Sequence, residues 1–143
     1  GGDAIEDLIG SSSGLIGARI SAEEGPWLID EVPILALAAA LASGESRFCG
    51  LGELRHKESD RLAGIASLLA SFGADAKVEG DDLVVKGVKS LRGAAVDSLG
   101  DHRLAMTGYI AGCLASGESI VLGASCAEIS YPTFYDDFVK RSK

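Results

Sequence analysis

The sequence contains few of the residues that most often bind metals. It has two histidines, His56 and His102, and three cysteines, and none of these forms a pair at the ligand spacing of a zinc site. We therefore expect no metal centre. The sequence also lacks the glycine-rich fingerprints of dinucleotide-binding and P-loop proteins, and it has no nucleophile elbow of the hydrolase type.

Long apolar runs and an excess of positive charge are also missing. No apolar run reaches the roughly 18 residues that a membrane helix needs, and no basic-then-apolar leader opens the sequence, so we expect no membrane partner. The formal net charge of −8 makes binding to nucleic acid or to an anionic membrane unfavourable. A local group of basic residues is therefore more informative here than in a basic protein.

Aromatic residues make up only 6% of the sequence, whereas alanine and glycine are frequent. This composition favours close-packed helices and tight turns over a large aromatic core. The cysteines, Cys49, Cys113 and Cys126, are an odd number in apolar or small-residue surroundings. We expect them to be buried free thiols, which fits a reducing, cytoplasmic location.

An internal repeat organises the 143 residues, which are enough for one ordinary domain. The hexapeptide Leu-Ala-Ser-Gly-Glu-Ser occurs at 41–46 and again, letter for letter, at 114–119. Each copy ends an alanine-rich apolar run and precedes a short segment typical of a strand. We therefore predict two structural units of similar build, one over about 15–90 and the other over about 91–143.

Periodicity, helix-stop glycines and turn residues predict an α/β (α+β) chain. We expect a helix that begins near Pro33 and a second one capped by Ser59. The predicted strands are 4–9, 17–21, 48–51, 74–78, 83–86, 94–97 and 119–122, and the predicted helices are 33–43, 59–72, 102–114 and 133–140. The first unit then reads β-α-β-α-β-β and the second β-α-β-α. The second lacks a closing hairpin, so we expect the chain to be part of something larger.

The densest charged stretch is Lys57-Glu58-Ser59-Asp60-Arg61, at a predicted strand-to-helix junction. The first turn of a helix exposes unpaired N–H groups and a partial positive charge, so this junction suits a phosphate or carboxylate ligand. Glu58 is a candidate for proton transfer. The alternative interpretation is a solvated helix start with a capping acid and mutually paired charges.

Asp101-His102-Arg103 lies at the corresponding junction of the second unit. If both junctions open at the same end, Arg61 and Arg103 converge on one cleft, which would suit an anionic ligand. Alternatively, Asp101 caps its helix and Arg103 pairs with a nearby acid. Asp30 precedes the first helix, where it would act as a base or simply as a cap. His102 is either a structural hydrogen-bonding residue or a base.

Five segments occur together in an order that resembles the carboxy-terminal part of the 5-enolpyruvylshikimate-3-phosphate synthase family. They are Leu-Ile-Asp-Glu at 28–31, Glu-Leu-Arg at 53–55, Lys-Glu-Ser-Asp-Arg at 57–61, Asp-His-Arg-Leu-Ala-Met at 101–106 and Ser-Tyr-Pro-Thr-Phe at 130–134. The resemblance extends over nearly the whole chain. The pentapeptide followed by Asp-His-Arg argues against the two related alternatives, another enolpyruvyl transferase and an RNA-phosphate cyclase.

The resemblance implies a function. Members of this family transfer the carboxyvinyl group of phosphoenolpyruvate to the 5-hydroxyl of shikimate-3-phosphate, without metal or organic cofactor, on the route to chorismate and aromatic amino acids. By resemblance, Asp30 would be the base for the hydroxyl and Glu58 would handle the proton at the methylene carbon. Lys57 would lie where the phosphate and hydroxyl meet, with His102 beside the substrates, and Arg61 and Arg103 would hold phosphoenolpyruvate.

The family fold has two lobes, each built from three β-α-β-α-β-β units. The resemblance thus implies that this chain is a fragment of one lobe, with the missing amino-terminal part of the enzyme as its partner. Many members carry lysine where this chain has Ile129. We expect the isolated chain to be catalytically silent. The non-enzymatic alternative is a folded subdomain that binds no ligand usefully.

Overall fold

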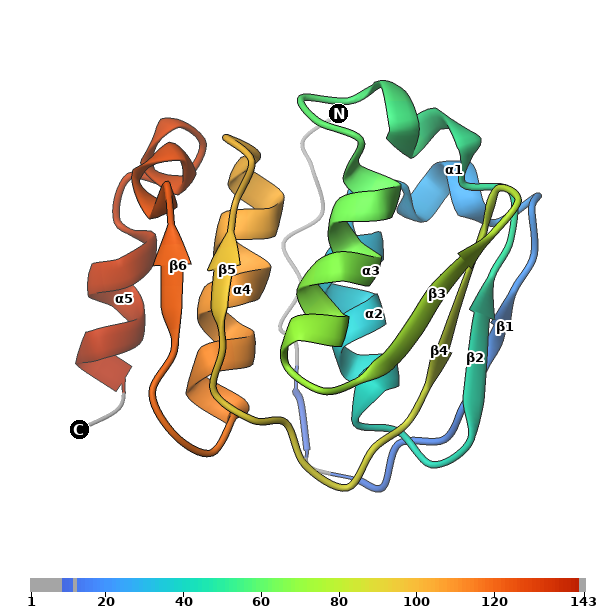
Figure 1. The fold of residues 1–143 in the computed structure, drawn as a ribbon, viewed down its shortest axis with the longest axis horizontal. Coiled ribbons are helices and arrows are strands. Elements are labelled where there is room, and N and C mark those ends of the chain that lie inside the picture. The colour runs from blue at the N-terminus through green and yellow to red at the C-terminus, as the bar shows by residue number, and fades with distance from the viewer. Residues whose placement is uncertain (1–8, 12, 142–143) are drawn as a thin grey trace.

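Two sheets of unequal size are joined by packed helices in the computed structural model, which describes residues 9–11 and 13–141 (Figure 1). The strands are β1 (Arg19–Ile20), β2 (Glu45–Phe48), β3 (Asp75–Glu79), β4 (Asp82–Lys86), β5 (Ala95–Asp97) and β6 (Ile120–Leu122). The α-helices are α1 (Gly25–Leu28), α2 (Val32–Ala40), α3 (Arg61–Ser71), α4 (His102–Leu114) and α5 (Phe134–Arg141). Two short 3₁₀ helices, η1 (Gly52–His56) and η2 (Ala124–Ile129), complete the order.

The larger sheet has the strand order β1-β2-β4-β3. β1 runs parallel to β2, whereas β4 is antiparallel to both of its neighbours. The smaller sheet consists of β5 and β6, which are parallel. The predicted orders, β-α-β-α-β-β followed by β-α-β-α, are therefore confirmed by the α-helices and strands, with the one-turn helix α1 as an addition.

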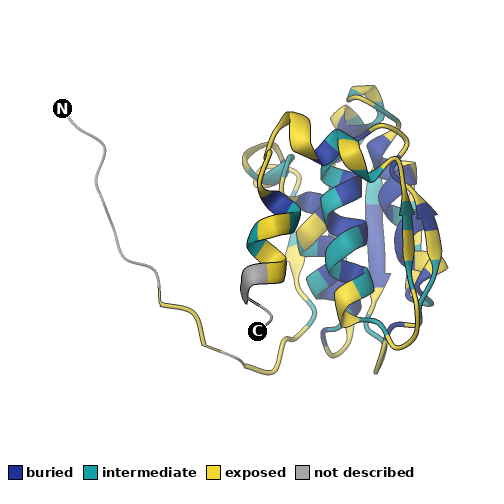
Figure 2. Ribbon diagram, turned by 90° about the vertical axis from the view of Figure 1, so that its left-hand side faces the viewer, coloured by how far each residue is buried: buried dark blue, intermediate teal, exposed yellow. Residues whose placement is uncertain are grey.

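The core lies where α2, α3 and α4 contact one another and the sheets (Figure 2). It consists mainly of leucine, valine, isoleucine and alanine, together with Phe48 and Phe72. The expected small aromatic contribution is thus confirmed for this core. Trp27 is exposed on α1, and the remaining aromatic side chains gather around Tyr109 on α4, whose ring packs edge-on against Phe134, Tyr135 and Phe138 of α5.

The repeated hexapeptide has a structural cause, because both copies make the same hydrogen bonds. Ser43 exchanges backbone hydrogen bonds with Leu15 and Gly17, and Ser116 does the same with Leu91 and Gly93. The second serine of each copy accepts a hydrogen bond from a backbone N–H, at 3.1 Å in the first unit and 3.4 Å in the second. The glycines at 44 and 117 adopt nearly identical positive φ angles of 92° and 95°. Each copy therefore joins the end of a helix to a parallel strand pair.

Several predicted boundaries are wrong, each for a local reason. The helix predicted over 33–43 ends at Ala40, because residues 41–44 form the turn that the hexapeptide requires. The strand predicted over 48–51 lies at 45–48, where it pairs with β4. The strand predicted over 4–9 falls outside the described residues except for Ile9, which is in no strand.

Two predictions about single side chains are also corrected. Asp60, not Ser59, is the N-cap of α3, and its carboxylate accepts a hydrogen bond of 3.0 Å from the backbone N–H of Ala63. All three cysteines are free, as predicted, but only Cys49 is buried, whereas Cys126 is half-buried and Cys113 is exposed on α4. None of the helices in the described ranges has the length and apolar character needed to cross a membrane.

Alanine at Gly17 or Gly93 is expected to destabilise the chain. A Cβ atom would lie 2.2 Å from the Glu45 carbonyl oxygen in the first case and 2.1 Å from that of Glu118 in the second. We expect each change to lower the free energy of unfolding by about 1–3 kcal/mol, measured by urea denaturation. Gly14→Ala is the matched control, because no atom lies within 4 Å of its Cβ position. Equal midpoints for all three variants would contradict the repeat geometry.

Candidate active site

The starts of α3 and α4 lie at the same end of the molecule (Figure 1). The preceding segments bring their charged residues there, η1 leading into Lys57 and Glu58, and β5 leading into Asp101. Arg61 and Arg103 both contact the carboxylate of Asp30, at 3.0 Å and 3.7 Å. The structure therefore brings together the charged residues that the sequence pattern singled out.

Arg61 is the centre of this cluster and has a side chain only 1% exposed. Each of its guanidinium nitrogens donates to a different carboxylate. Nε donates to Asp101 at 2.8 Å, Nη1 to Asp30 at 3.0 Å and Nη2 to Glu58 at 2.5 Å. A buried cation is costly unless it is paired and hydrogen-bonded, and this arrangement supplies a carboxylate for every nitrogen.

Asp101 is fully buried and has two functions in the structure. Its Oδ1 accepts hydrogen bonds from the backbone N–H groups of Arg103 and Leu104, and thereby caps α4. Its Oδ2 accepts from Arg61 and, at 3.2 Å, from the Ser59 hydroxyl. Burial alone would raise the pKa of the Asp101 carboxyl. The hydrogen bond and charge of Arg61, together with the two backbone N–H groups, outweigh burial and hold that pKa below its ordinary value.

Glu58 and His102 face each other across the two units. His102 Nδ1 lies 3.6 Å from Glu58 Oε1, while the other oxygen of Glu58 accepts from Arg61. Glu58 is about half exposed, at 47%, so a ligand can reach its carboxylate. A carboxylate beside an imidazole has the groups needed for proton transfer.

Asp30 also points into the cluster and caps no helix. The N-cap of α2 is Glu31, which makes no capping hydrogen bond through its side chain. The capping interpretation of Asp30 is therefore wrong. Arg103 lies between Asp30 and Glu31, 3.7 Å from a carboxylate oxygen of each.

Lys57 is positioned by residues that precede it in η1. Its ammonium donates to Glu53 at 2.7 Å, and this hydrogen bond raises the pKa of Lys57. Arg55 ties the same segment to the turn between β3 and β4, donating to the Asp81 carboxylate at 3.2 Å and to the Gly80 carbonyl at 2.6 Å. Glu53 and Arg55 of the motif at 53–55 thus hold in place the segment that carries Lys57.

The cluster contains more acidic than basic side chains. Its cations Lys57, Arg61 and Arg103 all lie within ion-pair distance of acids, and those acids are Asp30, Glu31, Glu53, Glu58 and Asp101. An anionic ligand must therefore displace a carboxylate or be assisted by positive charge from elsewhere. Within the described ranges, no buried side-chain nitrogen or oxygen lacks a hydrogen-bond partner.

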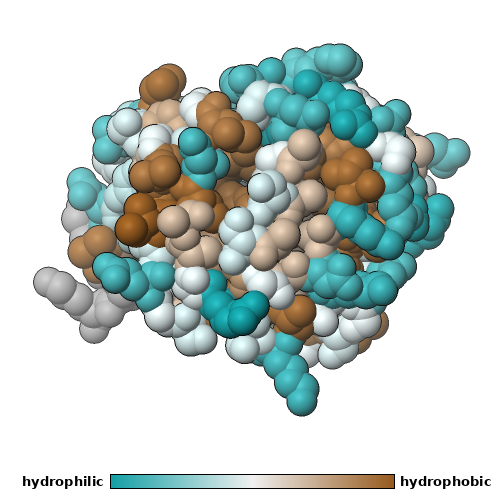
Figure 3. Space-filling view, in the orientation of Figure 1, coloured by the Kyte–Doolittle hydropathy of each residue, from teal (hydrophilic) through white to brown (hydrophobic). Residues whose placement is uncertain are grey.

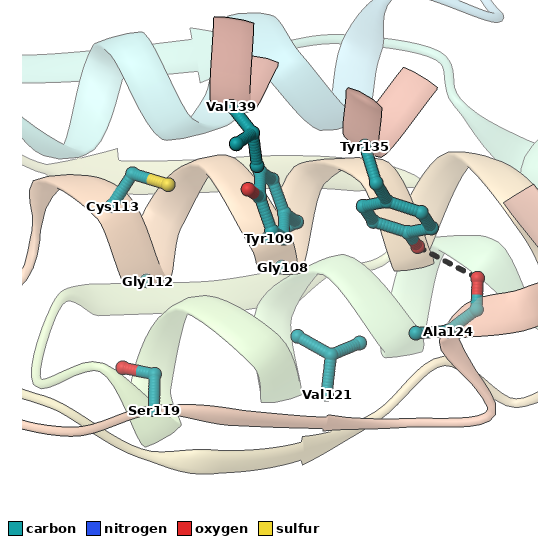
Figure 4. Close-up of a pocket in the computed structure, with 9 residues that line it drawn as sticks. All are labelled: Gly108, Tyr109, Gly112, Cys113, Ser119, Val121, Ala124, Tyr135 and Val139. Carbon is teal, nitrogen blue, oxygen red and sulfur yellow. Dashed lines mark hydrogen bonds between the residues drawn. The ribbon is translucent and has the colours of Figure 1, made fainter. Parts of the chain in front are cut away.

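A small cavity of about 170 Å³ adjoins the cluster and is lined by Asp30 and Arg103 together with apolar side chains of α2 and α4 and Phe134. A larger one of about 570 Å³ lies away from the cluster, between α4, β6 and α5 (Figure 4). Tyr109, Cys113, Val121, Tyr135 and Val139 are among its lining residues, and none of the residues lining it is charged. The smaller cavity is the candidate site, because it is the one of these two that charged side chains line.

Ile120 and Leu122 of β6 are each about half exposed, and they alternate along the strand with Val121, which lines the larger cavity. Figure 3 shows apolar patches on the face of the molecule that is turned to the viewer in Figure 1. Over the part of the chain that the structure describes, no group of three or more histidine, cysteine, aspartate or glutamate side chains is arranged to hold a metal ion.

Comparison with known proteins decides the family. The family model described as EPSP synthase (3-phosphoshikimate 1-carboxyvinyltransferase) matches residues 4–138. The chain belongs to the EPSP synthase family. A 3-phosphoshikimate 1-carboxyvinyltransferase of Pelotomaculum thermopropionicum is 48% identical over 88% of this chain and 29% of its own length. The relative of the same name from Roseiflexus sp. is 48% identical over 94% of this chain and 31% of its own length.

Solved structures of the EPSP synthase family agree in fold. The enzyme from Acinetobacter baumannii superposes with a TM-score of 0.81 at 35% sequence identity, covering 86% of this chain and 29% of that structure. The predicted fold class is therefore confirmed. The present chain spans about 30% of the length of the EPSP synthases that it matches.

Three residues contribute to this site in ways that their sequence pattern did not predict. Glu53 and Arg55 lie in a quoted motif, and their charges were the available signal, but only the structure shows Lys57 and the β3–β4 turn as their partners. For Asp101, the capping alternative is correct but incomplete, since the same carboxylate also holds Arg61. No spacing rule pairs two residues so far apart in the chain.

Asp101→Asn is expected to lower the free energy of unfolding at pH 7 by about 3 kcal/mol, because it leaves a buried guanidinium without one of its carboxylates. The folded-state pKa of Asp101 lies below the unfolded value, so its ionisation stabilises the fold above the ordinary carboxyl pKa and is lost as the pH falls through the folded value. The difference between wild type and variant should therefore be complete at pH 7 and shrink below about pH 4.

Urea denaturation between pH 7 and pH 2.5 measures this difference. Asp60→Asn is the control, because Asp60 caps α3 through the Ala63 N–H but is half exposed and makes no hydrogen bond to Arg61. Asparagine caps a helix about as well as aspartate, so this variant should unfold like the wild type. A difference between wild type and Asp101→Asn that stays constant down to pH 2.5 would contradict the assignment.

Proposed function

We propose that this chain is part of an enzyme that transfers the carboxyvinyl group of phosphoenolpyruvate to the 5-hydroxyl of shikimate-3-phosphate, with release of phosphate. The observation that carries the proposal is the meeting of two carboxylates, Asp30 and Glu58, on one buried guanidinium in a chain of this family. The reaction needs a group to take the hydroxyl proton and a group to protonate the methylene carbon. Two carboxylates on different nitrogens of Arg61 provide these separately.

The proposed steps follow from the substrates. The 5-hydroxyl oxygen attacks C2 of phosphoenolpyruvate while its proton goes to the Asp30 carboxylate. Glu58, entering this step as the carboxylic acid, delivers a proton to C3, which gives a tetrahedral intermediate. Glu58, now a carboxylate, takes one proton back from the C3 methyl group as the C2–O bond to phosphate breaks, and the departing phosphate takes the proton from Asp30, which restores the double bond. His102, 3.6 Å from Glu58, is placed to stabilise that carboxylate between the two steps.

The proposed binding residues are Lys57, Arg61 and Arg103, since both substrates are anions. Arg103 and Lys57 are the more accessible of these, with side chains 32% and 25% exposed. Arg61 offers its two Nη groups only when Asp30 or Glu58 gives way to a ligand. Ile129 is exposed and uncharged, so it adds no cation to this set.

We propose that the two units, about 15–90 and 91–143, belong to one lobe of the enzyme and that its amino-terminal part completes the lobe. In the first unit, β4 covers the edge of β2 with the buried side chains Leu83, Val84 and Val85. Across the described ranges, no strand covers the corresponding edge of β6. The large apolar cavity between α4, β6 and α5 lies beside that edge and would accept the side chains of an added hairpin (Figure 4).

The proposed role places the protein in the shikimate pathway, in the biosynthesis of chorismate and aromatic amino acids, and in the cytoplasm. No cofactor or metal takes part in the proposed steps. The proposed partners are the two small-molecule substrates and the amino-terminal part of the enzyme, not nucleic acid or membrane. The acidic composition supports the exclusion of nucleic acid.

Amide NMR titration of the chain with phosphoenolpyruvate, and then with shikimate-3-phosphate, tests the site. We expect weak, saturable shifts at 57–61 and at Arg103, because these groups are preformed. Arg103→Ala should abolish the shifts, whereas Arg19→Ala, at an exposed position on β1, should leave them unchanged. A dispersed spectrum without shifts would instead support the folded subdomain that binds no ligand usefully.

The isolated chain is expected to form no product. All three proposed binding cations are paired with acids, and no second lobe excludes water from the site. The measurement is phosphate release from both substrates at high protein concentration, with a complete EPSP synthase as the positive control. Release above the background without protein would show that this chain already contains a working site.

A further inference from the structure

The guanidinium of Arg61 is held by one buried carboxylate and by two carboxylates that are partly exposed. Asp101, which holds Nε, is 0% exposed, whereas Asp30 and Glu58, which hold Nη1 and Nη2, are 44% and 47% exposed. Solvent and ligands can therefore reach the carboxylates on the Nη side. They cannot reach the carboxylate on the Nε side.

Asp101 itself has little freedom to move. Its Oδ1 is fixed by the backbone N–H groups of Arg103 and Leu104, and its own N–H donates to the Ser98 carbonyl at 2.8 Å. The Ser59 hydroxyl donates to the oxygen that also holds Arg61, from the segment just before α3. A single carboxylate thus joins the first turn of α4 to the side chain that begins α3.

We propose that Asp101 is a positioning residue that fixes Arg61 by Nε, so that its two Nη groups face the site and exchange carboxylates for an anionic ligand. This inference rests on the proposed function, because it assumes that the ligand is an anion. It adds a residue to which the sequence pattern assigned only a helix cap. A guanidinium held on one edge presents its two Nη groups in a fixed plane, which suits a phosphate or carboxylate.

The alternative is that Asp101 only caps α4, and the chain offers a comparison that separates the two roles. Asp60 caps α3 in the same way, through a backbone N–H, but makes no hydrogen bond to Arg61. Asn is a good cap, so Asp101→Asn keeps an acceptor for Arg103 and Leu104. With its amide oxygen kept for those two N–H groups, the asparagine turns an uncharged NH2 donor toward Arg61 in place of the charged oxygen.

The test is the exchange with water of the Arg61 Nε–H proton, followed by ¹H–¹⁵N NMR of the full 143-residue chain without ligand. We expect this proton to exchange about 10- to 100-fold more slowly than that of the exposed Arg19, because it lies in a buried, charge-assisted hydrogen bond. Asp101→Asn should remove that protection while the amides of Arg103 and Leu104 stay protected. Asp60→Asn should leave Arg61 unchanged.

Persistent protection of the Arg61 Nε–H in folded Asp101→Asn would overturn the proposal, because Asp30 and Glu58 would then suffice to hold the side chain. If that variant does not fold, two measurements on the wild-type chain still test the proposal. A through-hydrogen-bond coupling between Arg61 Nε and the Asp101 carboxylate carbon supports the anchor, and exchange as fast as that of Arg19 overturns it. Neither readout uses phosphoenolpyruvate, so the titration above can fail while the anchor is confirmed.

Discussion

The buried ion pair between Arg61 and Asp101 is the interaction on which the rest of the site depends. Taking two charges out of water costs several kcal/mol for each ion, and their attraction offsets this only when every remaining donor and acceptor is satisfied. Here the backbone of α4, the Ser59 hydroxyl and two further carboxylates supply those partners. Loss of one partner would leave an uncompensated buried charge, so the starts of α3 and α4 and the carboxylates of Asp30 and Glu58 are fixed together.

The internal repeat explains how one chain brings two helix starts to the same end. The same serine and glycine hydrogen bonds turn each helix back into a parallel strand pair, and the charged junctions then follow the strands in the same direction. The repeat is structural rather than functional. The hexapeptide follows α2 in the first unit and α4 in the second, so α4 corresponds to α2 and α5 to α3. Asp101-His102-Arg103 therefore corresponds to the junction at Asp30, and its predicted correspondence with 57–61 is wrong. Where α3 begins with the buried Arg61, α5 begins with Phe134, which packs among aromatic rings. The two units therefore build one charged site between them and not one site each.

Charge balance explains why we expect a well-formed charged cluster in a chain that forms no product by itself. A cluster whose cations are already neutralised is stable without ligand, which lets the fold form before substrates arrive. The same neutralisation weakens attraction for a doubly or triply charged anion. In the EPSP synthase family the missing positive charge and the exclusion of water would have to come from the rest of an enzyme of which this chain spans about 30%.

The sequence by itself determined the order of helices and strands, because helical and strand periodicities, stop glycines and capping residues are local signals. Its charged junctions and its family resemblance also predicted Asp30, Glu58, Arg61 and Arg103 as site residues, and the structure brings these four side chains together. The sequence misplaced the strand at 45–48, whose position is set by pairing with β4. It also misplaced the cap of α3, because the Ala63 N–H donates to Asp60. Only the tertiary structure could show that Asp101 anchors Arg61 and that Glu53 and Arg55 support the loop of Lys57. The physical reason is distance along the chain: the periodicities that predict helices extend over a few residues, whereas Asp101 reaches Arg61 only after the core has packed α3 against α4.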